Sequence, residues 1–220
     1  MMKKAGFTLA EVLITLTIIG VIATLTLPAL MSNVSEQQNI TAFKKIINSL
    51  SEAGQMNGTV SGFDYSSITA NSAGPTDTFE NATSAATAVQ SLAALLNDRL
   101  QVDQSQSGAG AIPASANSEC LATDLDIIMR DNTAVCFPAA TQTDANRIMT
   151  VWVDVNGVKG PNLPSTCTEE GCTTKATRVI RDQFPVTLVG GNAVPGHWID
   201  AIGNTANNAN DFAARYAMTK

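Results

Sequence analysis

The chain contains 220 residues, with 19 acidic against 13 basic side chains and a formal net charge of −6 at pH 7. This acidic balance argues against a surface built to hold nucleic acid, which would be basic, so no nucleic-acid partner is expected. The part that begins at Asn57, roughly 165 residues, is long enough to bury one hydrophobic core. One globular domain is therefore expected there.

An apolar segment occupies the beginning of the chain. Between Phe7 and Met31 the only charged residue is Glu11. At a rise of about 1.5 Å per residue, a helix of this length crosses a bilayer core of about 30 Å. A cleaved secretory signal has a shorter apolar core of about 7–15 residues followed by an A-x-A-like site, and this segment has neither property. Residues 7–31 are therefore predicted to span a membrane.

The basic residues around this segment predict its orientation. Lys3 and Lys4 precede it, and the next basic residue is Lys44. The positive-inside rule then places the short N-terminus in the cytoplasm and the residues after about 31 on the other side of the membrane.

The residues before the span form a specific block. The stretch "KKAGFTLAE", from Lys3 to Glu11, combines a basic pair, a glycine, an aromatic residue and an acid four residues after it. The block resembles the processing signal of type IV prepilins and of the pseudopilins of type II secretion. This resemblance implies that a membrane-embedded prepilin peptidase cuts between Gly6 and Phe7 and N-methylates Phe7. Residues 1–6 would then be a leader peptide, and its removal would leave a net charge of −8.

Glu11 needs an explanation because a carboxylate inside a span costs roughly 2.5–3.5 kcal/mol on insertion scales. From the residues alone, the side chain either snorkels to the nearby cytoplasmic face or meets a partner. The resemblance implies the partner, which is the Phe7 amine of a neighbouring subunit, largely protonated at neutral pH. Such a buried pair serves alignment better than net stability. Glu11 is therefore expected to act in filament assembly.

Two kinds of residue modify the apolar helix. Threonine hydroxyls are expected to bond back to carbonyls of the preceding turn, at Thr15, Thr17, Thr24 and Thr26. Gly20 and Pro28 are weak points, since a proline removes one helical hydrogen bond. Pro28 has two readings that stay open. The resemblance implies a kink or a locally melted stretch in the packed filament, and the residues alone allow a helix that breaks where it leaves the membrane.

The helix is expected to continue beyond the membrane over residues 32–56. Apolar residues recur there at spacings of three and four, which predicts a buried stripe. The members of the stripe are Ile40, Phe43, Ile47, Leu50 and Gly54. The helix is expected to fade near Met56-Asn57-Gly58, because Asn-Gly favours a turn.

The first part of the predicted head, about residues 66–118, reads as an inserted region of loops and one helix. Stretches rich in Gly, Ser, Ala and Asn predict loops over Ser66 to Thr78 and Gln104 to Ser118. Between them, the apolar positions predict an amphipathic helix from about Ser84 to Gln101.

In the second part of the head, about residues 125–190, apolar residues recur with the period of two that is typical of strands. Residues 126–137 predict a hairpin with a tight Asp131-Asn132 turn, and Ile148 to Val155 and Phe184 to Val189 predict two further strands. The expected fold is α+β, with a long N-terminal transmembrane and amphipathic helix packed on a C-terminal antiparallel sheet. The resemblance to pilins implies the same layout, with residues 57–220 as the head.

All four cysteines lie in the part predicted to be outside the cytoplasm. An even number in an exported head favours disulfides, and four cysteines allow three connectivities. The favoured pairing joins Cys120 to Cys136 across the hairpin and Cys167 to Cys172 around a short loop. Structural zinc is disfavoured because no second close pair exists and His197 is remote. No catalytic setting is recognisable around His197 either.

One loop has residues suited to a hard cation. The stretch "DVNGVKGPN" follows the strongest strand and carries oxygens at Asp154, Asn156 and Asn162, with Asp182 as a further donor. Calcium is one hypothesis for this loop, since the major secretion pseudopilins are known for a calcium site in such loops. An ordinary Asx-Gly turn without metal is the favoured alternative.

The expected function is that of a structural subunit, not an enzyme. The resemblance implies cleavage by prepilin peptidase, then polymerisation with copies of itself or related pilins through an inner-membrane assembly platform. The product would be a type IV pilus or a type II secretion pseudopilus. The expected location is the cytoplasmic membrane, with one pass and the head outside. The alternatives are a minor subunit with an adhesive head, or an anchored enzyme.

Overall fold

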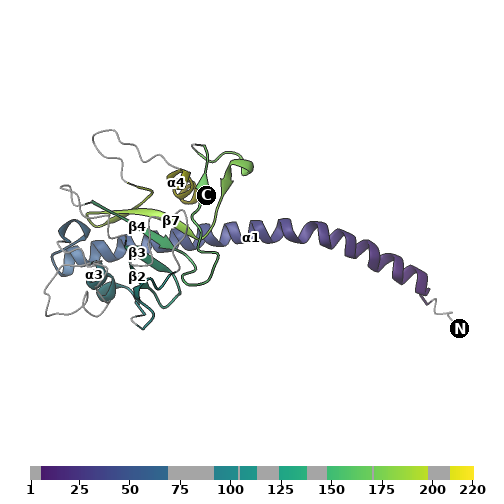
Figure 1. The fold of residues 1–220 in the computed structure, drawn as a ribbon, viewed down its shortest axis with the longest axis horizontal. Coiled ribbons are helices and arrows are strands. Elements are labelled where there is room, and N and C mark those ends of the chain that lie inside the picture. Colours follow the sequence, from purple (N-terminus) through teal and green to yellow (C-terminus); the bar gives the residue numbers. More distant parts are fainter. Residues whose placement is uncertain are drawn as a thin grey trace. The chain divides into compact units, whose positions relative to one another are not determined.

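The computed structural model describes residues 6–68, 92–103, 105–112, 124–137, 148–169, 171–197 and 209–220. The chain divides into two compact units, Met1–Gln38 and Asn39–Lys220. The second unit, called the head below, contains the sheet and the hydrophobic core (Figure 1). The first contains the N-terminal part of the longest helix.

The longest helix, α1, runs from Leu9 to Val60 (Figure 1). It passes through Pro28 without interruption, so a helix broken at this residue is wrong, while a kink in a packed filament stays a prediction. The predicted buried stripe is confirmed, since Ile40, Phe43 and Leu50 are each at most 3% exposed.

The helix ends two residues beyond the predicted end near Met56-Asn57-Gly58, because α1 continues to Val60. The side chain of Asn57 is buried, where its Nδ2 donates to Phe63 O at 2.8 Å and its Oδ1 accepts from Arg99 Nε at 2.9 Å. The residue that would favour a turn is therefore used in packing. The chain turns away two residues after Val60, at Gly62, whose φ of 77° favours glycine.

An antiparallel sheet forms the centre of the head. Its strands, in order across the sheet, are β1 (Gly108–Ala109), β2 (Leu125–Ile128), β3 (Ala134–Phe137), β4 (Ile148–Asp154), β7 (Gln183–Val189) and β8 (Asn192–Pro195). All neighbouring strands pair antiparallel. The predicted layout of a long N-terminal helix and a C-terminal antiparallel sheet is confirmed, and the strands predicted at Ile148 and Phe184 are present.

Smaller elements complete the head. Two short strands, β5 (Thr166–Cys167) and β6 (Arg178–Val179), pair with each other outside the main sheet. The helices are η1 (Tyr65–Ser67), α3 (Leu92–Arg99), η3 (Lys175–Thr177) and α4 (Ala209–Thr219). α3 lies within the predicted helix of residues 84–101, of which residues 84–91 are outside the described part. Most of the two predicted loops also lies outside it.

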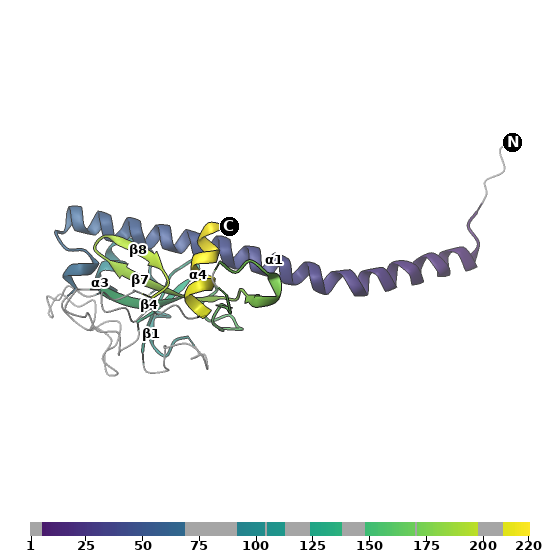
Figure 2. The ribbon, with the colours of Figure 1, turned by 90° about the horizontal axis from the view of Figure 1, so that it is seen from above.

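The core forms between the head's part of α1 and one face of the sheet. Phe43 of α1 stacks on Phe184 of β7 with ring centroids 4.2 Å apart, and both are fully buried. Further along the helix, Leu50 O accepts a hydrogen bond of 2.6 Å from the hydroxyl of Tyr65. Figure 2 shows this part of α1 running along the sheet with β7 and β8 next to it. The helix and the sheet are therefore held together over several turns.

The edge of the sheet at β8 is closed to further strand pairing. Ala193 N donates to Ser51 Oγ of α1 at 3.0 Å, and Pro195 has no N–H. Since an open edge needs free N–H groups to pair with another strand, this edge cannot recruit one through these residues.

The hairpin of β2 and β3 is confirmed, but its turn differs from the predicted two-residue turn. Met129 N donates to Thr133 O and Asn132 N donates to Met129 O, both at 2.8 Å, so the loop has three residues, 130–132. Only Asn132 adopts a positive φ, of 68°. A three-residue hairpin loop needs a left-handed residue at this place, and asparagine tolerates that conformation.

We expect Leu50→Ala to lower the free energy of unfolding of the head by about 3–5 kcal/mol, because it leaves a cavity beneath the sheet. Met56→Ala on the same helix is the matched control, since Met56 is 48% exposed. Denaturant unfolding of the full chain in detergent, followed by the fluorescence of buried Trp152, measures both variants. Equal destabilisation by the two substitutions would contradict the assignment of the core.

Candidate functional site

The beginning of α1 is organised around Thr8 and Glu11. Thr8 N and Thr8 Oγ1 both donate to Glu11 Oε2 at 2.8 Å, and Glu11 N donates to Thr8 Oγ1 at 3.3 Å. This reciprocal pattern is a capping box, with Thr8 at the N-cap of a helix that starts at Leu9. It satisfies N–H groups that the first turn of a helix otherwise leaves bare. Glu11 therefore has a local structural partner.

The spacing Thr-x-x-Glu is the ordinary signature of a capping box, so this one was readable from the sequence, although it was not predicted. Snorkelling and a neighbouring subunit were the two predicted explanations of the acid. The hydrogen bonds from Thr8 are a third explanation, since they lower the cost of the carboxylate in an apolar setting. Both use Oε2, and among the described residues no hydrogen bond to Oε1 is formed.

Gly6 and Phe7 precede the helix in an open setting. Phe7 is 90% exposed, and a Cβ added at Gly6 would meet no atom within 4 Å. Packing within the chain therefore does not require glycine at position 6. A requirement for a small residue there has to come from a protein that acts on this segment.

The side chains of the following turns are apolar and exposed. The exposed fractions of the large hydrophobic side chains that face outward between Leu9 and Val34 range from 45% to 79%. Leu13, Ile19, Leu25 and Met31 are among them. The threonine hydroxyls bond back into the helix as predicted, for example Thr17 Oγ1 to Leu13 O at 2.8 Å. Among the described residues, α1 is the one helix long and apolar enough to cross a membrane.

The fold brings the four calcium candidates together, but with their carboxylates already in use. Asp154 Oδ1 accepts from the N–H groups of Asn156 and Gly157, and Asp154 Oδ2 accepts from Gln183 Nε2 at 3.1 Å. Asp182 is fully buried, with Oδ1 accepting from Leu163 N.

The asparagine side chains of this loop also act as hydrogen-bond donors, through their amide nitrogens. Asp182 Oδ2 accepts from Asn156 Nδ2 at 3.1 Å and from Asn162 N at 2.8 Å. The Asn162 amide, turned over, donates to Gly157 O and Lys159 O. Among the described residues no group of three His, Cys, Asp or Glu side chains lies close enough to hold a metal. The arrangement fits a hydrogen-bonded turn better than a calcium cage, and calcium binding stays an untested prediction.

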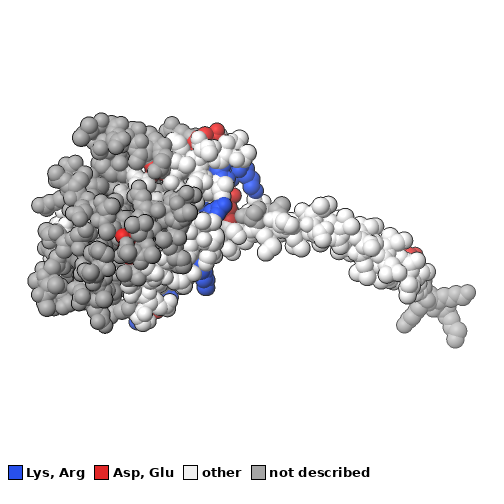
Figure 3. Space-filling model, in the orientation of Figure 1, with Lys and Arg blue, Asp and Glu red and all other residues white. Residues whose placement is uncertain are grey.

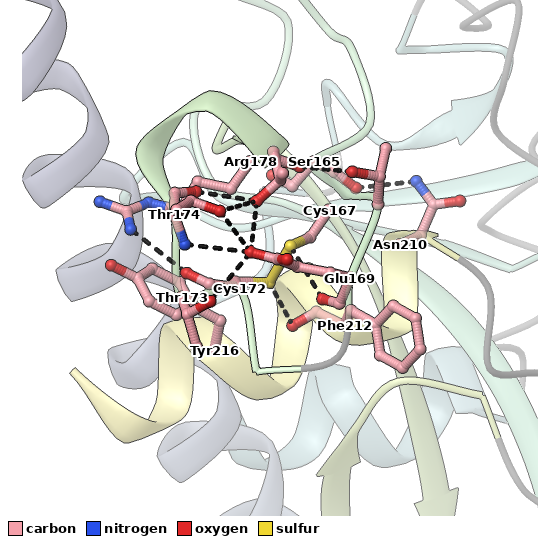
Figure 4. Close-up of a disulfide and its surroundings, with 12 residues drawn as sticks. Ser165, Cys167, Glu169, Cys172, Thr173, Thr174, Arg178, Asn210, Phe212 and Tyr216 are labelled. Carbon is pink, nitrogen blue, oxygen red and sulfur yellow. Dashed lines mark hydrogen bonds between the residues drawn. A yellow bond between two sulfur atoms is a disulfide. The ribbon is translucent and has the colours of Figure 1, made fainter.

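The disulfide predicted between Cys167 and Cys172 is confirmed. It lies between β5 and α4, with Cys172 Sγ 3.3 Å from Phe212 O (Figure 4). The loop that it closes is further tied by Glu169, whose carboxylate accepts hydrogen bonds from Thr174, Thr177 and Thr173. These bonds lower the pKa of Glu169 to about 2. Cys136 is also disulfide-bonded, and its predicted partner Cys120 lies outside the described residues.

His197 has an acidic neighbour that the sequence did not predict. Its backbone N donates to Asp211 Oδ1, and its Nδ1 lies 2.7 Å from the same oxygen. Asp211 is fully buried at the start of α4, so the pair fixes this helix to the turn after β8. The sequence separation of 14 residues, across two different elements, carries no local pattern from which the contact could be predicted.

Two buried carboxyls lie on the sheet face opposite α1. Asp126 of β2 and Asp154 of β4 are each 2% exposed, and Ile112 N donates to Asp126 Oδ2 at 2.7 Å. Burial raises the pKa of both carboxyls to about 7, despite these hydrogen bonds. Repulsion from neighbouring acids, Asp124 for one and Asp182 for the other, adds to the effect. The head therefore changes its charge near neutral pH.

Residues 1–27 match the family model described as the prokaryotic N-terminal methylation motif. This motif is the signal of type IV pilins and pseudopilins, and it contains Gly6, Phe7 and Glu11. Comparison with curated proteins and with solved structures found no match. The chain thus combines a pilin-type N-terminal signal with a pilin-like fold, and the motif marks it as a substrate of prepilin peptidase.

We expect the head to be more stable at pH 5 than at pH 8. A carboxyl whose pKa is higher in the folded state contributes stability that is present at low pH and lost as the pH rises through the folded pKa. The loss over this interval should be about 2 kcal/mol for each carboxyl, or roughly 5 °C in Tm. Tm measurements on the full chain in detergent at the two pH values test this.

Two variants identify the groups responsible. Asp126→Asn should flatten the pH dependence because it removes the ionisation and keeps an acceptor for Ile112 N. Asp103→Asn is the control, since hydrogen bonds from Ser105 lower the pKa of Asp103 and its loss should not flatten the curve. A Tm that rises from pH 5 to pH 8 in the unmodified chain would contradict the assignment.

Proposed function

We propose that the chain is a structural subunit that is cleaved before Phe7, N-methylated there, and polymerised through α1 into a type IV pilus or a type II secretion pseudopilus. The observation that carries this proposal is the N-terminal part of α1. Its most apolar stretch is not buried by any of the described residues, and the methylation motif lies at its start. Lipid can cover them before assembly, and the same helices of other subunits can cover them afterwards.

The capping box adds a detail to the proposed assembly contact. After cleavage, the α-amino group of Phe7 is a cation that needs an anionic partner in an apolar bundle. Thr8 occupies Oε2 of Glu11, so Oε1 is the oxygen that we assign to the amine of a neighbouring subunit. The capping box would hold the carboxylate in one position and so help to set the depth of each incoming subunit.

The disulfide supports an exported head. Disulfides persist in oxidising compartments, and Cys167–Cys172 lies in the head. Together with the two lysines before the apolar segment, this favours a cytoplasmic N-terminus, a single pass through the cytoplasmic membrane and a head outside. We propose prepilin peptidase, an inner-membrane assembly platform and other pilin-like subunits as the partners.

The proposal favours a structural role over an enzymatic one. Cys136, Cys167 and Cys172 are disulfide-bonded and provide no thiolate, and the His197–Asp211 pair ties α4 to the sheet. An adhesive minor subunit is the second candidate, because the head is larger than a minimal pseudopilin requires. Neighbouring genes separate the two machines: a secretin with several short pseudopilins favours secretion, and a retraction motor favours a pilus.

We expect Gly6→Val to leave unprocessed precursor in the membrane, while the unmodified chain begins with N-methylated Phe7. Since a side chain at position 6 meets nothing within 4 Å, the substitution should not disturb the fold. Gly20→Ala is the matched control in an equally open position and should be processed normally. Mass spectrometry of the N-terminus measures each outcome. An intact N-terminus on assembled unmodified protein would overturn the proposal.

Substitutions at Glu11 and Thr8 separate the two roles of the carboxylate. Glu11→Gln keeps a residue that fits the capping box but removes the charge. Thr8→Val removes the two hydrogen bonds of the Thr8 hydroxyl, leaves the one donated by Thr8 N, and keeps the charge of Glu11. We expect both variants to be cleaved, Thr8→Val to form filaments, and Glu11→Gln to form at most about one tenth of the normal amount, because its neighbour's amine is left unpaired in the bundle.

Gel shifts of the precursor and quantification of filaments in sheared fractions measure these two variants. Normal filaments from Glu11→Gln together with a loss of filaments from Thr8→Val would mean that Glu11 serves only to cap the helix.

A further inference from the structure

Basic side chains gather at one end of the head, the end at which α1 enters it. We call this the basic end and define it by Lys45, Arg130, Lys159, Lys175, Arg178 and Arg181. Lys45 lies on α1, near the first residue of the head, and its Nζ contacts Asp131 Oδ2 at 2.6 Å. Arg130 is the exposed residue before Asp131 in the β2–β3 loop. This ion pair places the loop beside the start of the head's part of α1.

The start of β7 adds two more basic residues at the same end. Phe184 of β7 stacks on Phe43, which is two residues before Lys45. Arg181 lies two residues before this strand. Asp182 then accepts hydrogen bonds from Asn156 and Asn162, which lie on either side of exposed Lys159 in the β4–β5 loop.

The small sheet of β5 and β6 contributes the last two. Arg181 N donates to Ser165 Oγ at 2.8 Å, directly before β5, and η3 and β6 carry Lys175 and Arg178. The guanidinium carbon of Arg178 lies 4.5 Å from the ring centroid of Tyr216 (Figure 4). The arginine is thereby held at the surface by α4.

The described acids at this end are fewer than these basic residues. Asp131 pairs with Lys45, Glu169 is tied by its threonines, Asp154 and Asp182 are buried, and Glu36 lies on α1 three residues before the head. Even with all five counted, the six basic residues exceed them. The leader accounts for two of the chain's 13 basic residues, so more than half of the remaining ones lie here, although the chain as a whole is acidic. In Figure 3 Lys and Arg side chains are visible at this end of the head with acidic side chains among them, and others lie along its lower edge.

We propose that the basic end binds the anionic headgroups of the membrane from which α1 emerges, before the subunit is assembled. The proposal rests on the proposed function, in which residues 7–31 span the membrane. Asn39 comes only eight residues after Met31, so even an extended chain keeps the first residue of the head within about 28 Å of the membrane surface. Juxtamembrane basic residues are attracted to anionic lipid, while the acidic remainder of the head is repelled.

Binding of this kind has a defined consequence for assembly. It would hold the head against the membrane in one orientation and would have to be released when the subunit enters a filament. Since the attraction is electrostatic and acts at exposed side chains, it falls off within a Debye length of about 8–10 Å at physiological ionic strength. The basic end is therefore a reversible contact rather than a second anchor.

The test uses the full-length chain, reconstituted at one copy per nanodisc. One set of discs contains phosphatidylcholine alone and the other contains an equal part of phosphatidylglycerol. The rate of lysine acetylation is measured by mass spectrometry at Lys159 and Lys175. We expect both lysines to react at least about threefold more slowly in the anionic discs, and about 0.5 M NaCl to abolish the difference.

Two variants control the measurement. An amine introduced by Met56→Lys, at an exposed position further along α1, should react equally in the two kinds of disc. Arg130→Glu combined with Lys159→Glu should remove the lipid-dependent protection of Lys175. Equal rates in both discs, or protection that depends on the number of copies per disc instead of on the lipid, would overturn the proposal, and the second result would indicate contact between copies. A chain that fails to enter nanodiscs would instead contradict the membrane-spanning subunit itself.

Discussion

The constraint on which this structure depends is that one helix must satisfy its apolar side chains in two different surroundings. From Ile40 onward, α1 buries a stripe beneath the sheet, with Phe43 stacked on Phe184 and Leu50 bonded to Tyr65. In the described part of the chain, the apolar window in the first part of the same helix is not buried. The apolar side chains from Ile40 onward are covered by the folded head. Those of residues 9–34 need a different apolar surrounding, for which we propose lipid or other subunits.

The charge at the start of the helix follows from the same constraint. An isolated carboxylate is costly in an apolar setting, and Glu11 reduces that cost locally through its two hydrogen bonds from Thr8. This arrangement both begins the helix and holds the acid in position. A group that has to find a partner in a packed bundle benefits from such preorganisation, since less freedom is lost when the contact forms.

Contacts within the head occupy several groups that could otherwise bind another chain. Ser51 and Pro195 leave no N–H available at these positions of the β8 edge, and the disulfide and the His197–Asp211 pair both hold α4 against the rest of the head. In the proposed assembly, contacts with other subunits would therefore be made by α1 and by the exposed side chains of the head. The buried carboxyls of Asp126 and Asp154 are the exception, because their pKa near 7 makes the stability of the head respond to pH near neutrality.

What the sequence by itself determined lies in residues that are close together in the chain. The block from Lys3 to Glu11, the apolar segment, the stripe from Ile40 to Leu50 and the strand at Ile148 are all local patterns, because helices and strands repeat over a few residues. The capping box of Thr8 and Glu11 was equally readable and was overlooked. Turns were harder to predict from local sequence. The Asn57-Gly58 pair is helical, and the side chain of Asn57 forms hydrogen bonds with Phe63 and Arg99. Only the tertiary structure decided that His197 meets Asp211, that Asp182 organises the Asn156–Asn162 loop and that six basic residues from six elements or loops share one end of the head. These groupings join residues that the chain separates by tens of positions, and only the packing of α1 on an antiparallel sheet brings them within reach.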